Sequence, residues 1–190
     1  MKTILNDYIS EIEINKSRFI TLLYKISSVD EVKEKLEITK EKYKDATHYC
    51  YAYVVDDNKK SSDDGEPGGT AGVPIMEVLL KNDLNYVLCV VVRYFGGIKL
   101  GAGGLVRAYS KSVSSSLIEE NIVSLVPGYE VGFEISYDNQ KNIDYMLKDI
   151  KVEKEYLNTI KYKVYIPKDK IHLLDNINYS ILKDIYIEIK

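Results

Sequence analysis

The stretch "VVVRYFGGIKLGAGGLVRAYSK", Val90–Lys111, decides the fold prediction for the first part of the chain. It begins in the most apolar segment, predicted as a strand over Val87–Phe95 with both faces buried. A glycine-rich turn follows, and the residues after it have the apolar spacing of a helix packed on a core. Although the net charge is −3, no Asp or Glu occurs from Leu84 to Ile118. The stretch therefore predicts a strand–turn–helix unit with a basic turn.

The glycine turn has the features of an anion receptor. Glycine lets a ligand approach backbone N–H groups closely, and the turn ends at a helix N-terminus, where free N–H groups and the dipole favour an anion. Two of the three arginines of the chain flank it, and arginine suits bidentate phosphate contacts. The candidate residues for an anion or nucleic acid are Arg93, Tyr94, Phe95, Lys99, Gly101, Gly103, Gly104, Arg107 and Lys111.

A purely structural interpretation of the turn stays open, in which the glycines serve packing and the basic side chains are merely solvated. Known nucleotide motifs do not fit. A Walker loop needs Lys and then Ser or Thr after its last glycine, but Leu105 and Val106 follow Gly104. A dinucleotide fingerprint starting at Gly101 needs Gly or Ala where Val106 stands. The expected anion is therefore neither ATP in a P-loop nor NAD in a doubly wound sheet.

An acidic loop, "SSDDGEPGGTAG", places Asp63, Asp64 and Glu66 within a segment, Asp56–Gly69, that is predicted to be irregular. These carboxylates could bind a divalent cation or act as acid and base, although their spacing misses that of a calcium loop. They could instead cap the next helix, or pair with one of the flanking arginines and hold the two glycine loops side by side. We predict no metal site and no cofactor.

His48 and Cys50 are two residues apart on a predicted strand, Thr47–Val55, and so share one face. Two residues do not make a zinc site, and a Cys–His nucleophile would need them on facing elements. We expect both to be buried or to line the rim of a site. Three tyrosines of the same segment fall on the opposite face, either as core residues or as a stacking surface for bases.

The composition indicates a soluble, cytoplasmic protein. The chain has 190 residues, of which 45% are hydrophobic and 29% charged. No apolar run reaches the roughly 18 residues of a membrane helix, and the N-terminus lacks the features of a signal peptide. Cys50 and Cys89 are therefore expected as reduced thiols without a disulfide partner. The negative net charge means that any surface for nucleic acid must be local.

The segment "PGYE", Pro127–Glu130, breaks the pattern, so we expect two domains, 1–127 and 128–190. In the first, an Asn15-Lys16 turn predicts a hairpin, and Ser28 with Glu31 predicts the capping box of a helix. A second helix is predicted from near Thr70 to about Asn82. In the second domain the order βαββαβ is that of a ferredoxin-like unit, with a helix over about 168–177.

Four segments, "SRFI", "DATHYCYAYVV", "SSDDGEPGGTAGVPI" and "VVVRYFGGIKLGAGGLVRAYSKSV", resemble the hallmark segments of the YigZ/IMPACT family. The resemblance covers roughly Ser17–Leu117, and the part from Gly128 onward is similar to the small C-terminal domain of bacterial members. It implies an α+β fold, with an N-terminal domain like domain 2 of ribosomal protein S5 and a ferredoxin-like C-terminal domain. Tyr51 and Gly68 depart from the pattern, which has tryptophan and serine there.

Two functions remain as hypotheses. The resemblance implies no catalytic activity, and eukaryotic members regulate translation by binding the activator of an initiation-factor kinase. The first hypothesis is a binding or regulatory protein linked to translation, whose basic glycine-rich surface takes RNA, the ribosome or a translation-related protein. The alternative is an enzyme acting on a phosphorylated small molecule, with the acidic loop supplying Mg²⁺ ligands or acid–base groups. We favour the first because no nucleophile–base pair can be assembled from the sequence.

Overall fold

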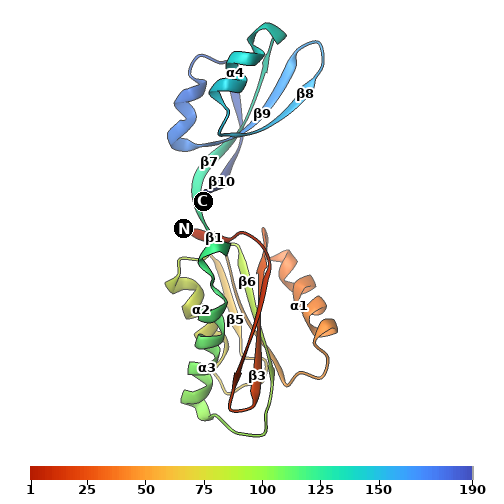
Figure 1. The fold of residues 1–190 in the computed structure, drawn as a ribbon, viewed down its shortest axis with the longest axis vertical. Coiled ribbons are helices and arrows are strands. Elements are labelled where there is room, and N and C mark those ends of the chain that lie inside the picture. The colour runs from red at the N-terminus through yellow and green to blue at the C-terminus, as the bar shows by residue number, and fades with distance from the viewer. Residues whose placement is uncertain (190) are drawn as a thin grey trace. The chain divides into compact units, whose positions relative to one another are not determined.

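The computed structural model describes residues 1–189, which divide into two compact units, Met1–Val123 and the part from Ser124 onward. Each unit combines an antiparallel sheet with helices, so the chain is of mixed α/β composition (Figure 1). None of the helices within residues 1–189 combines the length and the apolarity that a membrane crossing requires. The two units are described separately below.

The first unit is built on a five-stranded antiparallel sheet with β6 at its centre. In spatial order the strands are β2 (Tyr8–Ile14), β3 (Ser17–Lys25), β6 (Val87–Tyr94), β4 (His48–Val55) and β5 (Asn58–Ser62). Helices α2 (Gly72–Lys81) and α3 (Gly101–Ser116) cover one face and α1 (Asp30–Lys42) covers the other (Figure 1). The unit also contains β1 (Lys2–Ile4) and the 3₁₀ turn η1 (Glu119–Asn121).

Strand β6 is buried on both faces, as predicted, because alternate side chains enter two different cores. Val87, Cys89 and Val91 pack in the core beneath α2 and α3. The side chains between them, such as Leu88 and Val90, pack in the core beneath α1. Because successive side chains of a strand point to opposite faces of the sheet, this one apolar run contributes to both cores.

One local prediction is confirmed, and a second is confirmed in part. Asn15 and Lys16 both have positive φ angles, 46° and 64°, which is the backbone of the tight turn that joins β2 to β3. Ahead of α1, the Glu31 carboxylate accepts hydrogen bonds from the backbone N–H groups of Ser27 and Ser28. The N-cap position of α1 is Val29 rather than Ser28, and no side-chain oxygen there accepts a helix N–H, so only the glutamate half of the capping box forms.

One strand was missed, because β5 lies inside the segment that was predicted to be irregular. Its sequence "NKKSS" has no apolar alternation, and its residues are exposed or half-buried. It forms by pairing with β4, at the edge of the sheet. Edge strands are short and rich in lysine in many proteins because charge discourages further pairing, so composition alone does not reveal them.

In the second unit the strands lie in the spatial order β10, β7, β9, β8, and every pair is antiparallel. Along the chain the elements are β7 (Ile122–Ile135), η2 (Tyr137–Asn139), α4 (Gln140–Met146), β8 (Lys151–Tyr156), β9 (Ile160–Pro167), η3 (Lys168–Leu174) and β10 (Tyr179–Ile189). The core lies between the sheet and α4 with η3, around residues such as Val131, Tyr162 and Leu174. The helix expected over 168–177 is the shorter 3₁₀ helix η3.

The break expected at Pro127 is absent, because β7 runs through Pro127 and Gly128 as one strand. The pairing between β7 and β9 ends where Gly128 faces Pro167, so Pro127 has no partner on β9. On the other side of β7, Pro127 is paired with Tyr186 of β10. A proline is compatible with a strand where one side has no ladder partner for its missing N–H. The compact units divide four residues earlier than the sequence suggested.

We predict that Gly128→Ala destabilises the second unit, because the backbone of β9 and a side chain of β10 both lie close to Gly128. A Cβ atom at this position would lie 2.8 Å from the backbone oxygen of Ile166 and would overlap Ile187. We expect a loss of about 1–3 kcal/mol in unfolding free energy, measured with urea. Gly132→Ala is the control, because its Cβ would meet only the movable Leu182 side chain, at 3.2 Å. Equal losses for the two variants would contradict this account of the packing.

Candidate functional site

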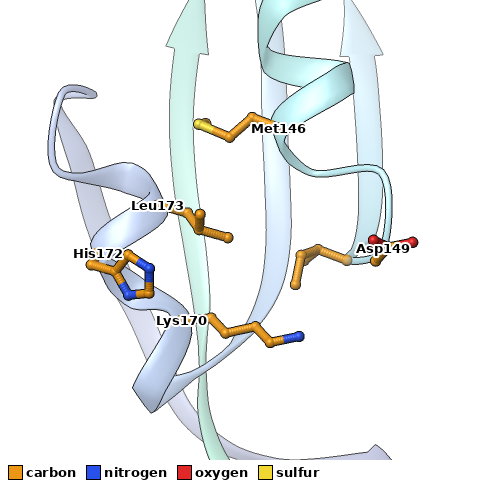
Figure 2. Close-up of a pocket in the computed structure, with 6 residues that line it drawn as sticks. Met146, Asp149, Lys170, His172 and Leu173 are labelled. Carbon is orange, nitrogen blue, oxygen red and sulfur yellow. The ribbon is translucent and has the colours of Figure 1, made fainter.

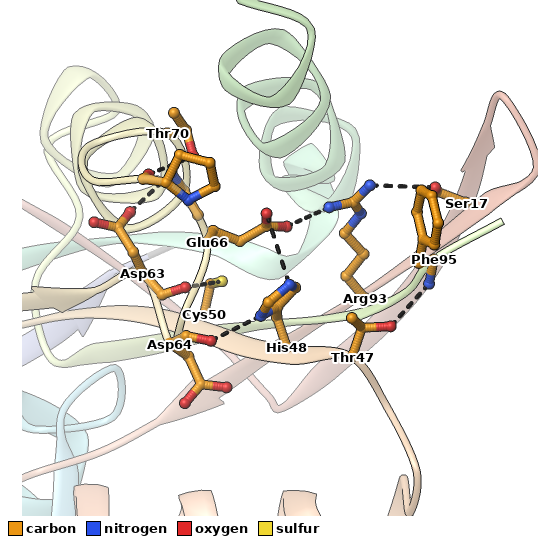
Figure 3. Close-up of polar contacts among 12 residues, drawn as sticks. Ser17, Thr47, His48, Cys50, Asp63, Asp64, Glu66, Thr70, Arg93 and Phe95 are labelled. Carbon is orange, nitrogen blue, oxygen red and sulfur yellow. Dashed lines mark hydrogen bonds and ion pairs between the residues drawn. The ribbon is translucent and has the colours of Figure 1, made fainter. Parts of the chain in front are cut away.

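A buried ion pair between Glu66 and Arg93 lies at the centre of the candidate site (Figure 3). Arg93 follows Val91 on the face of β6 beneath α2 and α3, and Glu66 lies in the loop between β5 and α2. Their nearest atoms, Nη1 and Oε1, are 2.5 Å apart, and the side chains are 6% and 3% exposed. Arg93 was a candidate for binding an external anion, but the protein's own carboxylate holds it here.

Tyr109 connects helix α3 to this pair. Its hydroxyl donates a hydrogen bond of 2.8 Å to Glu66 Oε1, and its ring packs edge-on against Phe19, with ring centroids 5.3 Å apart. Burial raises the pKa of Tyr109 far above its ordinary value, so the phenol remains a neutral donor. Three segments that are distant in sequence, the acidic loop, β6 and α3, therefore meet at one carboxylate.

Cys50 packs against the same cluster as an unreactive thiol. Its Sγ atom lies 2.9 Å from the Asp63 carbonyl oxygen and 3.3 Å from the Tyr109 hydroxyl, both within reach of its single thiol hydrogen. Burial raises the pKa of Cys50 to about 12, so the thiol is protonated at neutral pH. Both cysteines in the described part of the chain, Cys50 and Cys89, are free and buried.

Asp63 caps helix α2. Its carboxylate accepts hydrogen bonds of 2.8 to 2.9 Å from the backbone N–H groups of Gly69, Ala71 and Gly72. Burial alone would raise the pKa of Asp63, but the three amide donors outweigh it and hold the pKa below its ordinary value. Of the roles that the sequence left open for the acidic loop, Asp63 therefore has the one of capping the next helix.

Asp64 and His48 fasten the acidic loop to strand β4. The Asp64 carboxylate accepts the backbone N–H of Tyr49 at 2.6 Å, and His48 Nδ1 donates to the Asp64 carbonyl oxygen at 2.8 Å. His48 Nε2 lies 3.7 Å from Glu66 Oε2. All three acidic-loop carboxylates thus have partners inside the protein. Within residues 1–189, no three or more His, Cys, Asp or Glu side chains are arranged to hold a metal ion.

The remaining cations of the glycine turn face solvent. Lys99, Arg107 and Lys111 are exposed, and no carboxylate of residues 1–189 lies within ion-pair distance of them. Arg107 extends towards the first turn of α3, since its Nη1 atom lies 3.7 Å from where a Cβ of Gly103 would be. That turn has no acidic residue and no side-chain cap, so its first N–H groups have no partner within the helix.

Lys16 is a basic residue of this region that the sequence did not indicate. Gly96 packs directly on the backbone of Lys16, and a Cβ at Gly96 would overlap the Lys16 carbonyl group. This contact brings the β2–β3 turn beside the glycine turn, and Lys16 is exposed there without an ion pair in the described residues. No pattern could have shown this, because the two residues are 80 positions apart. We call Lys16, Lys99, Arg107 and Lys111 the basic surface.

The aromatic candidates differ in accessibility. Tyr94 is half-buried, with its hydroxyl donating to the Lys44 carbonyl oxygen. Phe95 is 46% exposed. Among the other two glycines named from the sequence, Gly101 is exposed with a φ of 69°, and Gly104 is half-buried against Leu100.

The second unit has a small pocket that the sequence did not suggest (Figure 2). It has a volume of about 250 Å³ and lies between the end of α4 and η3. Apolar side chains and three polar ones, Asp149, Lys170 and His172, line it. His172 Nδ1 donates to the Asp169 carbonyl oxygen, at 3.0 Å. None of these residues belongs to the predicted site.

We predict that Glu66→Leu destabilises the first unit by about 3–5 kcal/mol, because it leaves the buried Arg93 guanidinium without a counter-ion. The double variant Glu66→Leu/Arg93→Met should lose much less, since both charges are removed together. Urea denaturation measures both. The control is Glu77→Leu on the exposed side of α2, which should change stability by about 0.5 kcal/mol at most. A single variant as stable as the wild type would refute the role of the pair.

We predict that the contribution of Asp63 to stability depends on pH. Because its pKa is lower in the folded state than the ordinary value of about 3.9, the contribution is complete above that value and disappears as the pH falls through the folded pKa. Asp63→Asn removes the negative charge at the start of α2 and should therefore cost about 0.3–1 kcal/mol at pH 7 and less at pH 3. Asp57→Asn, at an exposed aspartate before β5, serves as the control. A loss for Asp63→Asn that is constant with pH would contradict this.

Comparison with known proteins gives a family match within the first unit. Residues 15–117 match the Impact N-terminal domain. IMPACT family member YvyE of Bacillus subtilis is 53% identical over 116 residues, which are 60% of this chain and 54% of the relative, so the match spans about half of that relative's length. IMPACT family member YigZ of Escherichia coli is 35% identical over 167 residues, or 84% of this chain and 82% of the relative.

One solved structure is similar to this chain along its whole length. A crystal structure of a hypothetical protein is similar over 100% of this chain and 97% of its own, with a TM-score of 0.64 and 32% identity. A likeness to the two-domain translational regulator Yih1 covers 60% of this chain with a TM-score of 0.34, which is too weak to support an inference. Since the Impact N-terminal domain spans more than half of the chain and YigZ aligns with most of it, this protein belongs to the IMPACT family.

Proposed function

We propose that this protein is a binding or regulatory protein linked to translation, and that its basic surface takes RNA or another phosphate-bearing partner. The observation that carries the proposal is the set of cations without an ion pair in the described residues, around the glycine turn and along α3, whose start is uncapped. Arg107 supports it most directly, because its guanidinium lies against the first turn of α3, where backbone N–H groups are also free. A phosphate there would meet N–H donors, the positive end of the helix dipole and a bidentate cation together.

The link to translation rests on family membership, through the eukaryotic members that regulate translation. The same kinship supports the finer fold assignment that we propose, a first unit like domain 2 of ribosomal protein S5 and a ferredoxin-like second unit. The strand order β10, β7, β9, β8, in which each of these neighbouring pairs is antiparallel, supports the latter. A cytoplasmic location belongs to the same proposal.

The enzyme hypothesis receives less support from the geometry of the acidic loop. It required carboxylates free to bind Mg²⁺ or to exchange protons with a substrate. Asp63 is held by three amides, Asp64 by the N–H of Tyr49, and Glu66 by Arg93 and Tyr109. Binding is therefore the better-supported function.

We predict that the basic surface gives salt-dependent RNA binding. Arg107→Ala and Lys111→Ala should each weaken binding and lower the slope of log affinity against log salt by about 0.7 to 0.9 for each phosphate that the variant no longer neutralises. Titration of a labelled RNA at several salt concentrations measures both quantities. Lys33→Ala is the matched control for Lys111→Ala, since Lys33 lies on α1, which covers the other face of the sheet. An Arg107→Ala protein that binds like the wild type would end the proposal.

A further inference from the structure

Phe95 is a large aromatic side chain that remains open to solvent at the end of β6. It is 46% exposed, whereas the strand before it is almost entirely buried. A single exposed apolar residue is ordinary on a protein surface. This one directly precedes the glycine turn, and Ile98, within that turn, is also exposed, at 44%.

Thr47 and the buried Arg93 side chain contact Phe95 and hold it in position (Figure 3). Its backbone N–H donates to Thr47 Oγ1, at 3.0 Å. The guanidinium carbon of Arg93 lies 5.6 Å from the centre of the Phe95 ring and 5.4 Å from that of Phe19. Because Glu66 holds Arg93, one buried cation supports the Phe95 ring from within the protein.

The ring is also close along the chain to the proposed phosphate site. Phe95 and Gly101, the first residue of α3, are six residues apart, so at most about 21 Å of extended chain separates them. One short stretch of a nucleic acid strand spans such a distance. Tyr94 and Tyr109 do not offer the same surface, since one is half-buried and the other fully buried.

We infer that the partner is single-stranded RNA, and that Phe95 stacks on one of its unpaired bases while the basic surface takes the flanking phosphates. This inference rests on the proposed function and narrows its partner. An aromatic face stacks on any base of a single strand, whereas a duplex hides its bases from such contact. The unpaired cations around the turn favour a polyanion over an apolar protein partner.

The test compares one labelled RNA oligonucleotide, free and annealed to its complement, with the wild type, Phe95→Ala, Phe95→Tyr, Phe95→Leu and Arg107→Ala. Phe95→Ala and Phe95→Leu should lower the affinity for the single strand about 5- to 150-fold without changing the salt slope, because stacking neutralises no phosphate. Phe95→Tyr keeps a ring and should stay near wild type. The annealed RNA should bind more weakly and respond little to changes at Phe95.

A direct readout is the fluorescence of 2-aminopurine placed in the single strand, which stacking quenches. Quenching by the wild type and by Phe95→Tyr, and its loss in Phe95→Leu, would support stacking. If Arg107→Ala weakens RNA binding but Phe95→Ala and Phe95→Leu bind like the wild type, the stacking inference is wrong and the proposed function stands. Preference for the duplex would also overturn it. If the wild type binds neither RNA, both the stacking inference and RNA as the partner in the proposed function fail.

Discussion

The buried ion pair between Glu66 and Arg93 is the interaction on which the rest of the first unit's candidate site depends. Removing two charges from water is costly, and such a pair is retained only where further hydrogen bonds satisfy it. Tyr109 donates to Glu66, and Ser17 Oγ accepts from Arg93 Nη2 at 3.4 Å and from the Gly96 N–H at 3.2 Å. Arg93 Nε is the exception, since it has no partner within residues 1–189. The pair thereby fixes the glycine turn relative to the acidic loop and to α3.

This arrangement explains how a protein of net charge −3 keeps a basic surface. Two carboxylates of the acidic loop are turned inward, Asp63 towards backbone amide groups and Glu66 towards Arg93. The four residues of the basic surface have no carboxylate within ion-pair distance in the described residues. An anionic partner would therefore meet local positive charge despite the overall sign of the chain.

The second unit has a different electrostatic character. Its strands carry cross-strand pairs of opposite charge, such as Lys163 with Glu130 and Lys161 with Glu134, whose closest atoms are 3.4 and 3.8 Å apart. Such exposed pairs contribute little stability, but they leave a surface of mixed sign. The second unit also has exposed lysines without an ion pair among the described residues, such as Lys148 and Lys170. The proposed function is assigned to the first unit because its exposed cations accompany a glycine-rich helix start that has no acidic residue.

By itself the sequence determined the features that depend on neighbouring residues: the doubly buried strand β6, the positive-φ turn at Asn15-Lys16, the start of α2 and the family. These follow from periods of two or 3.6 residues and from local backbone preferences, which are visible along the chain. The tertiary structure alone decided that Arg93 turns inward while Arg107 turns outward, that Lys16 joins the glycine turn, and that "NKKSS" becomes a strand. Each of these depends on a partner brought close only by folding, and a charged side chain looks the same in the sequence whether its partner is water or a buried carboxylate.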